Sequence, residues 1–219
     1  MSYRVRVWDL PTRLFHWLLF VAVVALVVTA KVGGNAMVWH FRLGYLVLSL
    51  LLFRLVWGVL GGRWSRFGSF LHSPQATWRY LRGQGDEASS IGHSPTGAAS
   101  VFALLLVLAA QVGSGLLSDD EIAFSGPLTR FVSGDTVGLA TWYHKAVGQW
   151  AVIGLVVLHV LAVLFYLWGK RQNLIAPMVH GDKQLASAAP SSRDDASARL
   201  LAAVVVAASG AVAWWVSTL

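Results

Sequence analysis

Five long apolar runs dominate this sequence and limit the folds that are open to it. They cover residues 14–30, 38–60, 97–117, 143–168 and 200–219. A helix needs about 20 apolar residues to cross a hydrocarbon core of about 30 Å, and each run is close to that length. Lipid offers the backbone no hydrogen-bond partner, so spanning segments are expected to be helices. The sequence therefore predicts an all-α integral membrane helical bundle with five transmembrane helices.

Composition supports this class of protein. The chain is 56% hydrophobic and only 12% charged, whereas soluble domains carry about 25% charged residues. It contains no cysteine, which excludes disulfides, thiolate metal sites, iron–sulfur clusters and covalently attached c-type haem. The charged N-terminal stretch has no signal-cleavage pattern, so we expect the first apolar run to be retained as an anchor.

The segments between the runs suggest a domain organisation. Residues 1–178, with the first four runs, are expected to form one transmembrane domain. Residues 179–199 end in a Ser/Ala-rich sequence that is typical of a flexible linker, and residues 200–219 are expected to form an additional C-terminal transmembrane helix. An acidic loop with Asp119, Asp120 and Glu121 is interpreted as solvated, although it would also suit a basic partner such as a c-type cytochrome.

The basic residues predict the orientation of the chain in the bacterial inner membrane. If the N-terminus is cytoplasmic, thirteen basic residues fall on the inner side and four on the outer side, which satisfies the positive-inside rule. The C-terminus is then periplasmic. The net charge of +7 reflects this topology, and nucleic-acid binding is disfavoured because the basic residues flank lipid-length runs.

Four of the seven histidines lie in or beside the apolar runs, namely His16, His40, His144 and His159. Ionisable residues at membrane depth are costly and usually have a partner or a function. Each histidine alone would suit an interhelical hydrogen bond. Together they sort by depth, with His16 and His159 toward the inner face and His40 and His144 toward the outer face. Facing neutral imidazoles can supply the two axial ligands of a haem b.

The spacing within the fourth run supports two cofactors rather than one. His144 and His159 are fifteen residues apart, about 22 Å along a helix, and their side chains project within about 60° of each other. Gly44 and Gly148 each follow an outer histidine by four residues, which would leave room for a flat macrocycle or serve ordinary helix packing. A zinc site would need its ligands clustered at one depth, and a proton relay would more often contain buried carboxylates.

Six segments in order resemble the bacterial cytochrome b-561 and nickel–iron hydrogenase b-type cytochrome family. They read VRVWDLPTRLFHW, HFRLGYLVLSLLLFRLVWG, SRFGSFLHSP, GHSPTG, GLLSDD and HKAVGQWAVIGLVVLHVLAVLFYL, and the resemblance covers residues 3–178. It implies a four-helix core with two haem b groups held by histidines of the first, second and fourth helices. It also implies electron transfer between the quinone pool and a periplasmic or membrane redox partner, such as a c-type cytochrome or a hydrogenase.

The resemblance places His16, His40, His144 and His159 on the ligand positions. The segment GHSPTG is similar to a Gly-His-Asn-Pro motif of the family, with Ser94 in the asparagine position, so the role of His93 stays open.

Three arginines lie at helix ends or just inside them, namely Arg13, Arg42 and Arg54. Because arginine binds carboxylates in bidentate fashion, each is a candidate to bind a haem propionate, and the alternative is an arginine that extends to the membrane interface.

The favoured hypothesis is a di-haem membrane cytochrome b, an electron-transfer subunit of a quinone-linked oxidoreductase. A haem-free membrane anchor that docks a periplasmic redox protein is the main alternative, and a small transporter with histidines in its pathway is another. The fifth run lies beyond the region of resemblance and would pack on a partner subunit or on a second copy in a homodimer.

Overall fold

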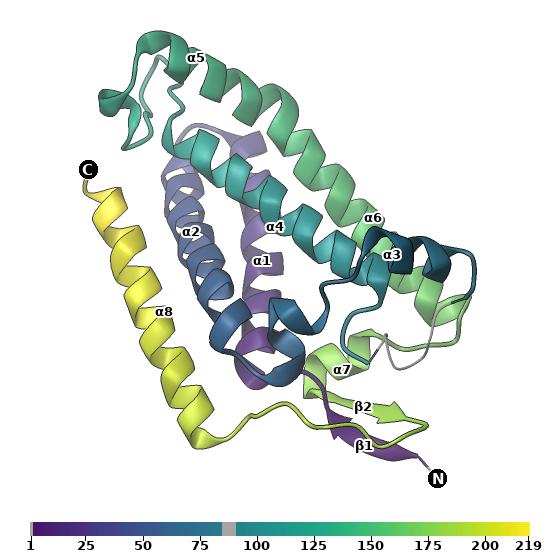
Figure 1. Ribbon diagram of the computed structural model, residues 1–219. Helices are drawn as coiled ribbons and strands as arrows, with labels where there is room; N and C mark the ends of the chain where they lie inside the picture. The colour runs from purple at the N-terminus through teal and green to yellow at the C-terminus, as the bar shows by residue number, and fades with distance from the viewer. Residues whose placement is uncertain (1, 85–90) are drawn as a thin grey trace. The chain divides into compact units, whose positions relative to one another are not determined.

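Five helical spans of the structure are long and apolar enough to cross a membrane. The computed structural model describes residues 2–84 and 91–219. The spans are α1 (Leu10–Val32), α2 (Ala36–Leu60), α4 (Pro95–Leu116), Gly134–Trp168 and α8 (Ala196–Ser217) (Figure 1). The fourth of these consists of α5 (Gly134–Trp142), the π-helix η5 (Tyr143–Gly148) and α6 (Gln149–Trp168). The predicted helical membrane bundle with five spans is thereby confirmed.

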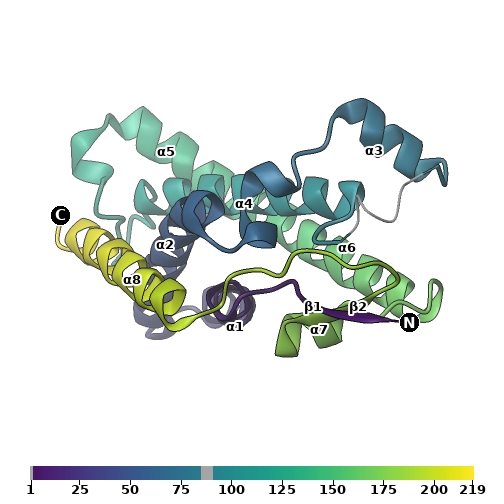
Figure 2. The same cartoon turned by 60° about the horizontal axis from the view of Figure 1, so that its bottom comes forward.

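Short elements precede or connect the spans. They are the 3₁₀ turns η1 (Arg63–Ser65), η2 (Phe67–Ser69) and η4 (Thr129–Phe131), the helices α3 (Pro74–Leu81) and α7 (Ile175–His180), and the strands β1 (Tyr3–Arg6) and β2 (Asp182–Leu185). The two strands pair antiparallel, with Tyr3 opposite Leu185 and Arg6 opposite Asp182, and α7 directly precedes β2 (Figure 2).

The chain divides into two compact units, each with a core of its own. The first consists of Met1–His16, Arg54–Phe102 and Leu158–Val205, and the second of Trp17–Phe53, Ala103–Val157 and Val206–Leu219. In the first, Val5, Val7 and Trp8 form a buried cluster. In the second, the buried residues come from four spans, and they are Ala22, Val23, Val47, Leu51, Leu108 and Val152. Large apolar side chains elsewhere on the spans, such as Leu106, are exposed, as expected where helices face lipid.

A buried carboxylate organises the start of α1 in the first unit. Asp9 is fully buried, and its oxygens accept hydrogen bonds from Thr12 N (2.8 Å), Trp57 Nε1 (3.1 Å), Gly62 N (3.1 Å) and Ser65 Oγ (2.6 Å). The bond from Thr12 is an N-cap interaction, which satisfies one of the free N–H groups at a helix start. One side chain thus fastens the start of α1, the end of α2 and η1 together.

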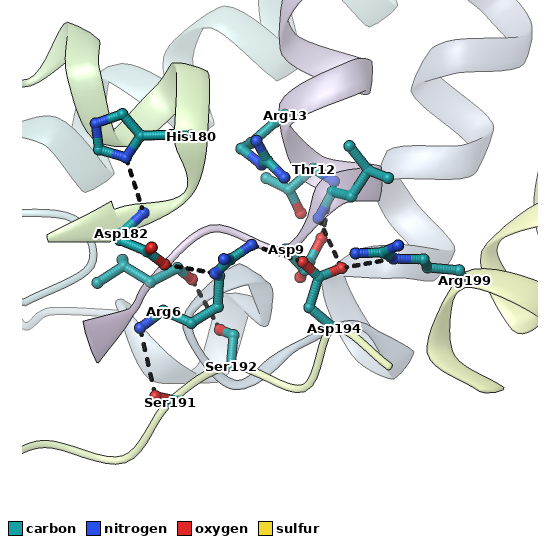
Figure 3. Close-up of polar contacts among 12 residues, drawn as sticks. Arg6, Asp9, Thr12, Arg13, His180, Asp182, Ser191, Ser192, Asp194 and Arg199 are labelled. Atoms are coloured by element: carbon teal, nitrogen blue, oxygen red, sulfur yellow. Dashed lines mark hydrogen bonds and ion pairs between the residues drawn. The ribbon is translucent and has the colours of Figure 1, made fainter. Parts of the chain in front are cut away.

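Residues 179–199, expected to be a flexible linker, are held by ion pairs in the structure (Figure 3). Asp182 on β2 pairs with Arg4 (2.6 Å) and Arg6 (2.5 Å). Asp194 pairs with Arg6 (2.9 Å) and Arg199 (3.2 Å) and accepts a hydrogen bond from the backbone N of Leu10 at the start of α1 (3.1 Å). We call this group the carboxylate clamp. Two acidic residues of this segment, Asp182 and Asp194, are therefore partners of N-terminal arginines.

Candidate functional site

His40 and His144 lie opposite each other in the second unit, with their ring planes nearly perpendicular. Their ring centroids are 6.2 Å apart and their planes are at 89°. A metal ion between two imidazoles needs a bond of about 2 Å on each side, and each ring centre lies about 1 Å behind its nitrogen, which gives a separation of about 6 Å. The two rings are therefore spaced so that both could bind one metal ion between them.

Hydrogen bonds fix the tautomer of both rings. His40 Nδ1 lies 3.0 Å from the carbonyl oxygen of Leu26, and His144 Nδ1 lies 2.9 Å from that of Gln111. A carbonyl oxygen can only accept, so each Nδ1 donates its hydrogen and each Nε2 keeps its lone pair. This is the arrangement that metal-binding histidines usually show, with the second ring nitrogen donating to a carbonyl or carboxylate.

A cavity of about 460 Å³ adjoins this pair. That volume lies in the range of ligand pockets, about 300–1,000 Å³. Its wall includes both histidines, Gly44 and the apolar residues Val23, Leu26, Val47, Leu108, Val112 and Val152. A Cβ at Gly44 would meet no atom of the described residues within 4 Å, so this glycine leaves the cavity wall open. Gly148 has a different environment, because a Cβ there would collide with the side chain of Gln111.

His16 and His159 form a second pair, in the first unit. Their ring centroids are 6.3 Å apart, with 54° between the planes. The same bond-length argument applies, so these two rings could also bind one metal ion between them. Their positions along the helices are unequal, since His16 lies six residues after the start of α1 and His159 nine residues before the end of α6. This offset does not keep the rings apart.

Arg54 is a buried cation with an unsatisfied donor. It is only 3% exposed, and its guanidinium lies over the ring of Phe67, 4.5 Å from the centroid. Within the described residues, its Nη1 is buried without a hydrogen-bond partner. Leaving such a group unpaired is expensive, so the site suits an added anionic acceptor.

His93 is the second buried donor in the first unit. Its ring packs against Trp8 (4.7 Å) and Phe70 (4.3 Å). Burial, with a smaller contribution from the nearby charge of Arg54, lowers the pKa of His93 to about 3, so the imidazole is neutral. Its Nδ1 is also buried without a hydrogen-bond partner in the part of the chain that the structure describes.

The other two arginines have different surroundings. Arg13 Nη1 donates to the carbonyl oxygen of Val179 (2.5 Å), and its Nε is buried without a partner among residues 2–84 and 91–219. Arg42 is exposed, and its guanidinium lies over the ring of Trp39, 5.0 Å from the centroid.

Sequence reasoning overlooked three residues of α4 that contact His144. Besides the carbonyl of Gln111, the hydroxyl of Ser114 lies 3.3 Å from His144 Nδ1, and a Cβ at Gly115 would lie 2.8 Å from His144 Cε1. The only sequence signal was a polar amide and a Gly-Ser-Gly triplet inside an apolar run.

The residues present fit haem b. Two histidine pairs carry the donor set that an axially coordinated iron requires, Gly44 leaves the wall of an apolar cavity open, and Arg54 presents an unpaired donor to an anion.

Comparisons with known proteins agree with this reading. Residues 7–181 match the family model described as prokaryotic cytochrome b561. The "Probable Ni/Fe-hydrogenase B-type cytochrome subunit" of Azotobacter vinelandii is 27% identical, over 85% of this chain and 91% of the relative. The "Probable Ni/Fe-hydrogenase 1 B-type cytochrome subunit" of Escherichia coli K12 is 24% identical, over 80% and 88%. No solved structure matches the chain. The chain belongs to the prokaryotic cytochrome b561 family and is a multi-pass membrane b-type cytochrome, a haem b protein of electron transfer.

Proposed function

We propose that this chain carries two haem b groups and passes electrons across the bacterial inner membrane, between the quinone pool and a redox partner. The observation that carries the proposal is the presence of two histidine pairs with nearly equal ring separations, 6.2 and 6.3 Å. Haem b, when bound, supplies one-electron redox chemistry whose potential depends on axial ligation, hydrogen bonding and burial.

The four histidines are assigned as metal ligands in two pairs. His40 and His144 hold the outer haem, and His16 and His159 hold the inner haem. At the outer site, the Nδ1 hydrogen bonds orient the rings, which raises the basicity of the ligating nitrogens. Gly44 keeps space for the macrocycle, and the apolar wall excludes water.

The propionates are assigned to arginines. Arg54 is the first candidate, because its buried Nη1 has no hydrogen-bond partner among the described residues, and His93 is a second donor in the same unit. Arg13, with its buried Nε, and Arg42, an exposed residue six positions after the start of α2, are further candidates. Gly148 supports the outer site indirectly, because it makes room for the Gln111 side chain.

The orientation and the partner are also part of the proposal. A cytoplasmic N-terminus puts the acidic loop 117–133 in the periplasm. There the Asp120 carboxylate accepts hydrogen bonds from the backbone N of Ile122, Ala123 and Phe124 and holds an exposed turn that a partner can contact. The relatives are named as nickel–iron hydrogenase subunits, which favours a hydrogenase over a c-type cytochrome. The helix α8, beyond the matched region, would contact that partner or a second copy of the chain.

Haem quantification with redox-difference spectroscopy tests the haem assignment. The purified protein is expected to bind two haems per chain, with b-type absorption bands on reduction. The double variant His40→Ala/His144→Ala should retain one haem, and His16→Ala/His159→Ala should retain the other. The variant His180→Ala, at an exposed histidine of α7, is the control and should retain both. Undiminished haem content in both double variants would refute the ligand assignment, and a colourless wild-type protein would favour the haem-free anchor.

Reduction by a quinol tests the link to the quinone pool. A soluble quinol analogue should reduce the haems of the membrane-embedded protein, and purified hydrogenase with hydrogen should reduce them from the partner side. If the quinol analogue leaves both haems oxidised while dithionite reduces them, the quinone link is excluded.

A further inference from the structure

We propose that α4, a helix with no histidine, positions the axial ligand His144 and thereby sets the properties of the outer haem. The inference rests on the proposed function and extends it. The positioning residues are Gln111, Ser114 and Gly115, which are at relative positions i, i+3 and i+4 and therefore share one face of the helix.

These three residues meet the imidazole of His144 from one side. The ring donates from Nδ1 to the carbonyl oxygen of Gln111 (2.9 Å). The hydroxyl of Ser114 donates to the same carbonyl (3.0 Å) and lies 3.3 Å from Nδ1. Gly115 lets the ring come close, since a Cβ at that position would lie 2.8 Å from Cε1 and 3.2 Å from Nδ1. The plane and the position of the ring are therefore defined by α4.

Gln111 also holds the backbone that carries the ligand. His144 lies in η5, a π-helix over Tyr143–Gly148, and such wide turns occur mostly as short insertions in α-helices, often at functional sites. The Gln111 side chain donates from Nε2 to the carbonyl oxygen of His144 (3.1 Å). Its carboxamide occupies the space that Gly148 leaves open. One residue thus contacts both the main chain and the side chain of His144.

Ring orientation has a measurable consequence in a bis-histidine haem. The iron d orbitals interact with the π-systems of both imidazoles, so the electron paramagnetic resonance signal of the oxidised haem depends on the angle between the ring planes. That angle is 89° for His40 and His144 and 54° for His16 and His159, so the two haems should give different signals. The hydrogen bond at Nδ1 also affects the midpoint potential, because it makes the ligand more basic.

A matched pair of glycine variants tests the proposal. Gly115 and Gly113 both lie in α4, but within the part of the chain that the structure describes, a Cβ at Gly113 would meet no atom within 4 Å. Both changes to alanine raise helix propensity equally. The holoprotein with Gly115→Ala should show a changed resonance signal and a shifted midpoint potential for the outer haem, or loss of that haem alone. The Gly113→Ala protein should match the wild type.

If Gly115→Ala and Gly113→Ala are indistinguishable, α4 does not position His144. The variant Gln111→Met keeps the length of the side chain but removes the donor to His144 O, so it provides a second test if Gly115→Ala does not accumulate. Gln111→Met should change the resonance signal and the midpoint potential of the outer haem only. If both stay unchanged, Gln111 does not position His144. Wild-type protein with fewer than two haems would instead refute the proposed function, before any variant is compared.

Discussion

At the scale of single residues, Arg54 is the strongest example of a side chain whose surroundings indicate a missing partner. Removing a guanidinium from water is costly, and the aromatic contact with Phe67 compensates only in part. Asp9 lies close enough to interact electrostatically, but its hydrogen bonds in the structure come from other groups. A propionate of the inner haem would satisfy Nη1.

We therefore predict that Arg54→Gln lowers the midpoint potential of the inner haem. Loss of a nearby positive charge favours the oxidised, more positive iron, and Arg54→Lys should have a smaller effect because it keeps the charge. Potentiometric titration of the purified protein measures both. The control is Arg63→Gln, because Arg63 is exposed and lies over Trp64. An inner-haem potential that is equally unaffected by Arg54→Gln and Arg63→Gln would exclude the electrostatic role of Arg54.

At the scale of elements, two helices begin with an aspartate cap in very different surroundings. Asp9 caps α1 through Thr12 N and is fully buried, whereas Asp195 caps α8 through Ala198 N at the same distance, 2.8 Å, and is exposed. Loss of an exposed cap costs about 1 kcal/mol. Loss of the Asp9 carboxylate also leaves buried donors unsatisfied, at about 1–3 kcal/mol each.

Alanine at the two caps should therefore have unequal effects on stability. We expect Asp9→Ala to lower the free energy of unfolding by about 3–5 kcal/mol and Asp195→Ala by about 1 kcal/mol. Unfolding of the detergent-solubilised holoprotein by increasing dodecyl sulfate, followed by circular dichroism, measures both. Equal losses would mean that the Asp9 network contributes no more than an ordinary cap.

The carboxylate clamp makes the stability of the region around β1, β2 and the start of α8 depend on pH. Burial alone would raise the pKa of Asp182, but hydrogen bonds from Arg4 and Arg6 outweigh it and hold the pKa below the ordinary value of 3.8. For Asp194, burial is likewise outweighed by its bonds to Arg199 and to the backbone N of Leu10. Because the folded-state pKa is the lower one, the stabilisation is complete above the unfolded value and is lost as pH falls through the folded value.

Amide protection in residues 182–195 should therefore stay constant from pH 7 to about 4 and fall below that. Hydrogen exchange, corrected for the intrinsic effect of pH on the exchange rate, measures this. The variant Asp182→Asn should show reduced protection already at pH 7, since it imitates the protonated carboxylate without the charge. A loss of protection between pH 7 and 5 would point to groups other than these carboxylates.

The elements also show which features of the structure could be predicted from the sequence and which could not. Hydropathy was sufficient for the five spans, because lipid imposes one requirement on every spanning segment. Ordering histidines by depth led to the same two pairs that lie close in the structure. The carboxylate clamp could not be predicted from the sequence. Arg6 and Asp182 are 176 residues apart, and a polar, Ser/Ala-rich segment does not indicate which residues it contacts. The role of Gln111 was equally hidden, since it depends on a neighbouring helix and on a π-turn.

At the scale of the whole molecule, residues 1–9 and the end of α8 lie on opposite faces of the membrane if all five candidate spans cross it. The helix bounds define which segments lie between the spans, so the basic residues on the two faces can be counted. Segments 1–9, 61–94 and 169–195 contain ten lysines and arginines, whereas 33–35 and 117–133 contain one, Arg130. The positive-inside rule favours a cytoplasmic location for the first group, and in the proposed orientation His40 and His144 are then nearer the periplasm.

Labelling of single cysteines can establish that orientation directly, because the chain has no cysteine of its own. Glu121 in segment 117–133 and Gln75 in segment 61–94 are both exposed, so Glu121→Cys and Gln75→Cys should fold normally. In spheroplasts, a membrane-impermeant thiol reagent should label the cysteine at 121 and spare the one at 75, and lysis should make both reactive. The reverse pattern would exchange the faces of the two histidine pairs: His16 and His159 would then be the pair nearer the periplasm, and the acidic loop would face the cytoplasm instead of the proposed periplasmic partner.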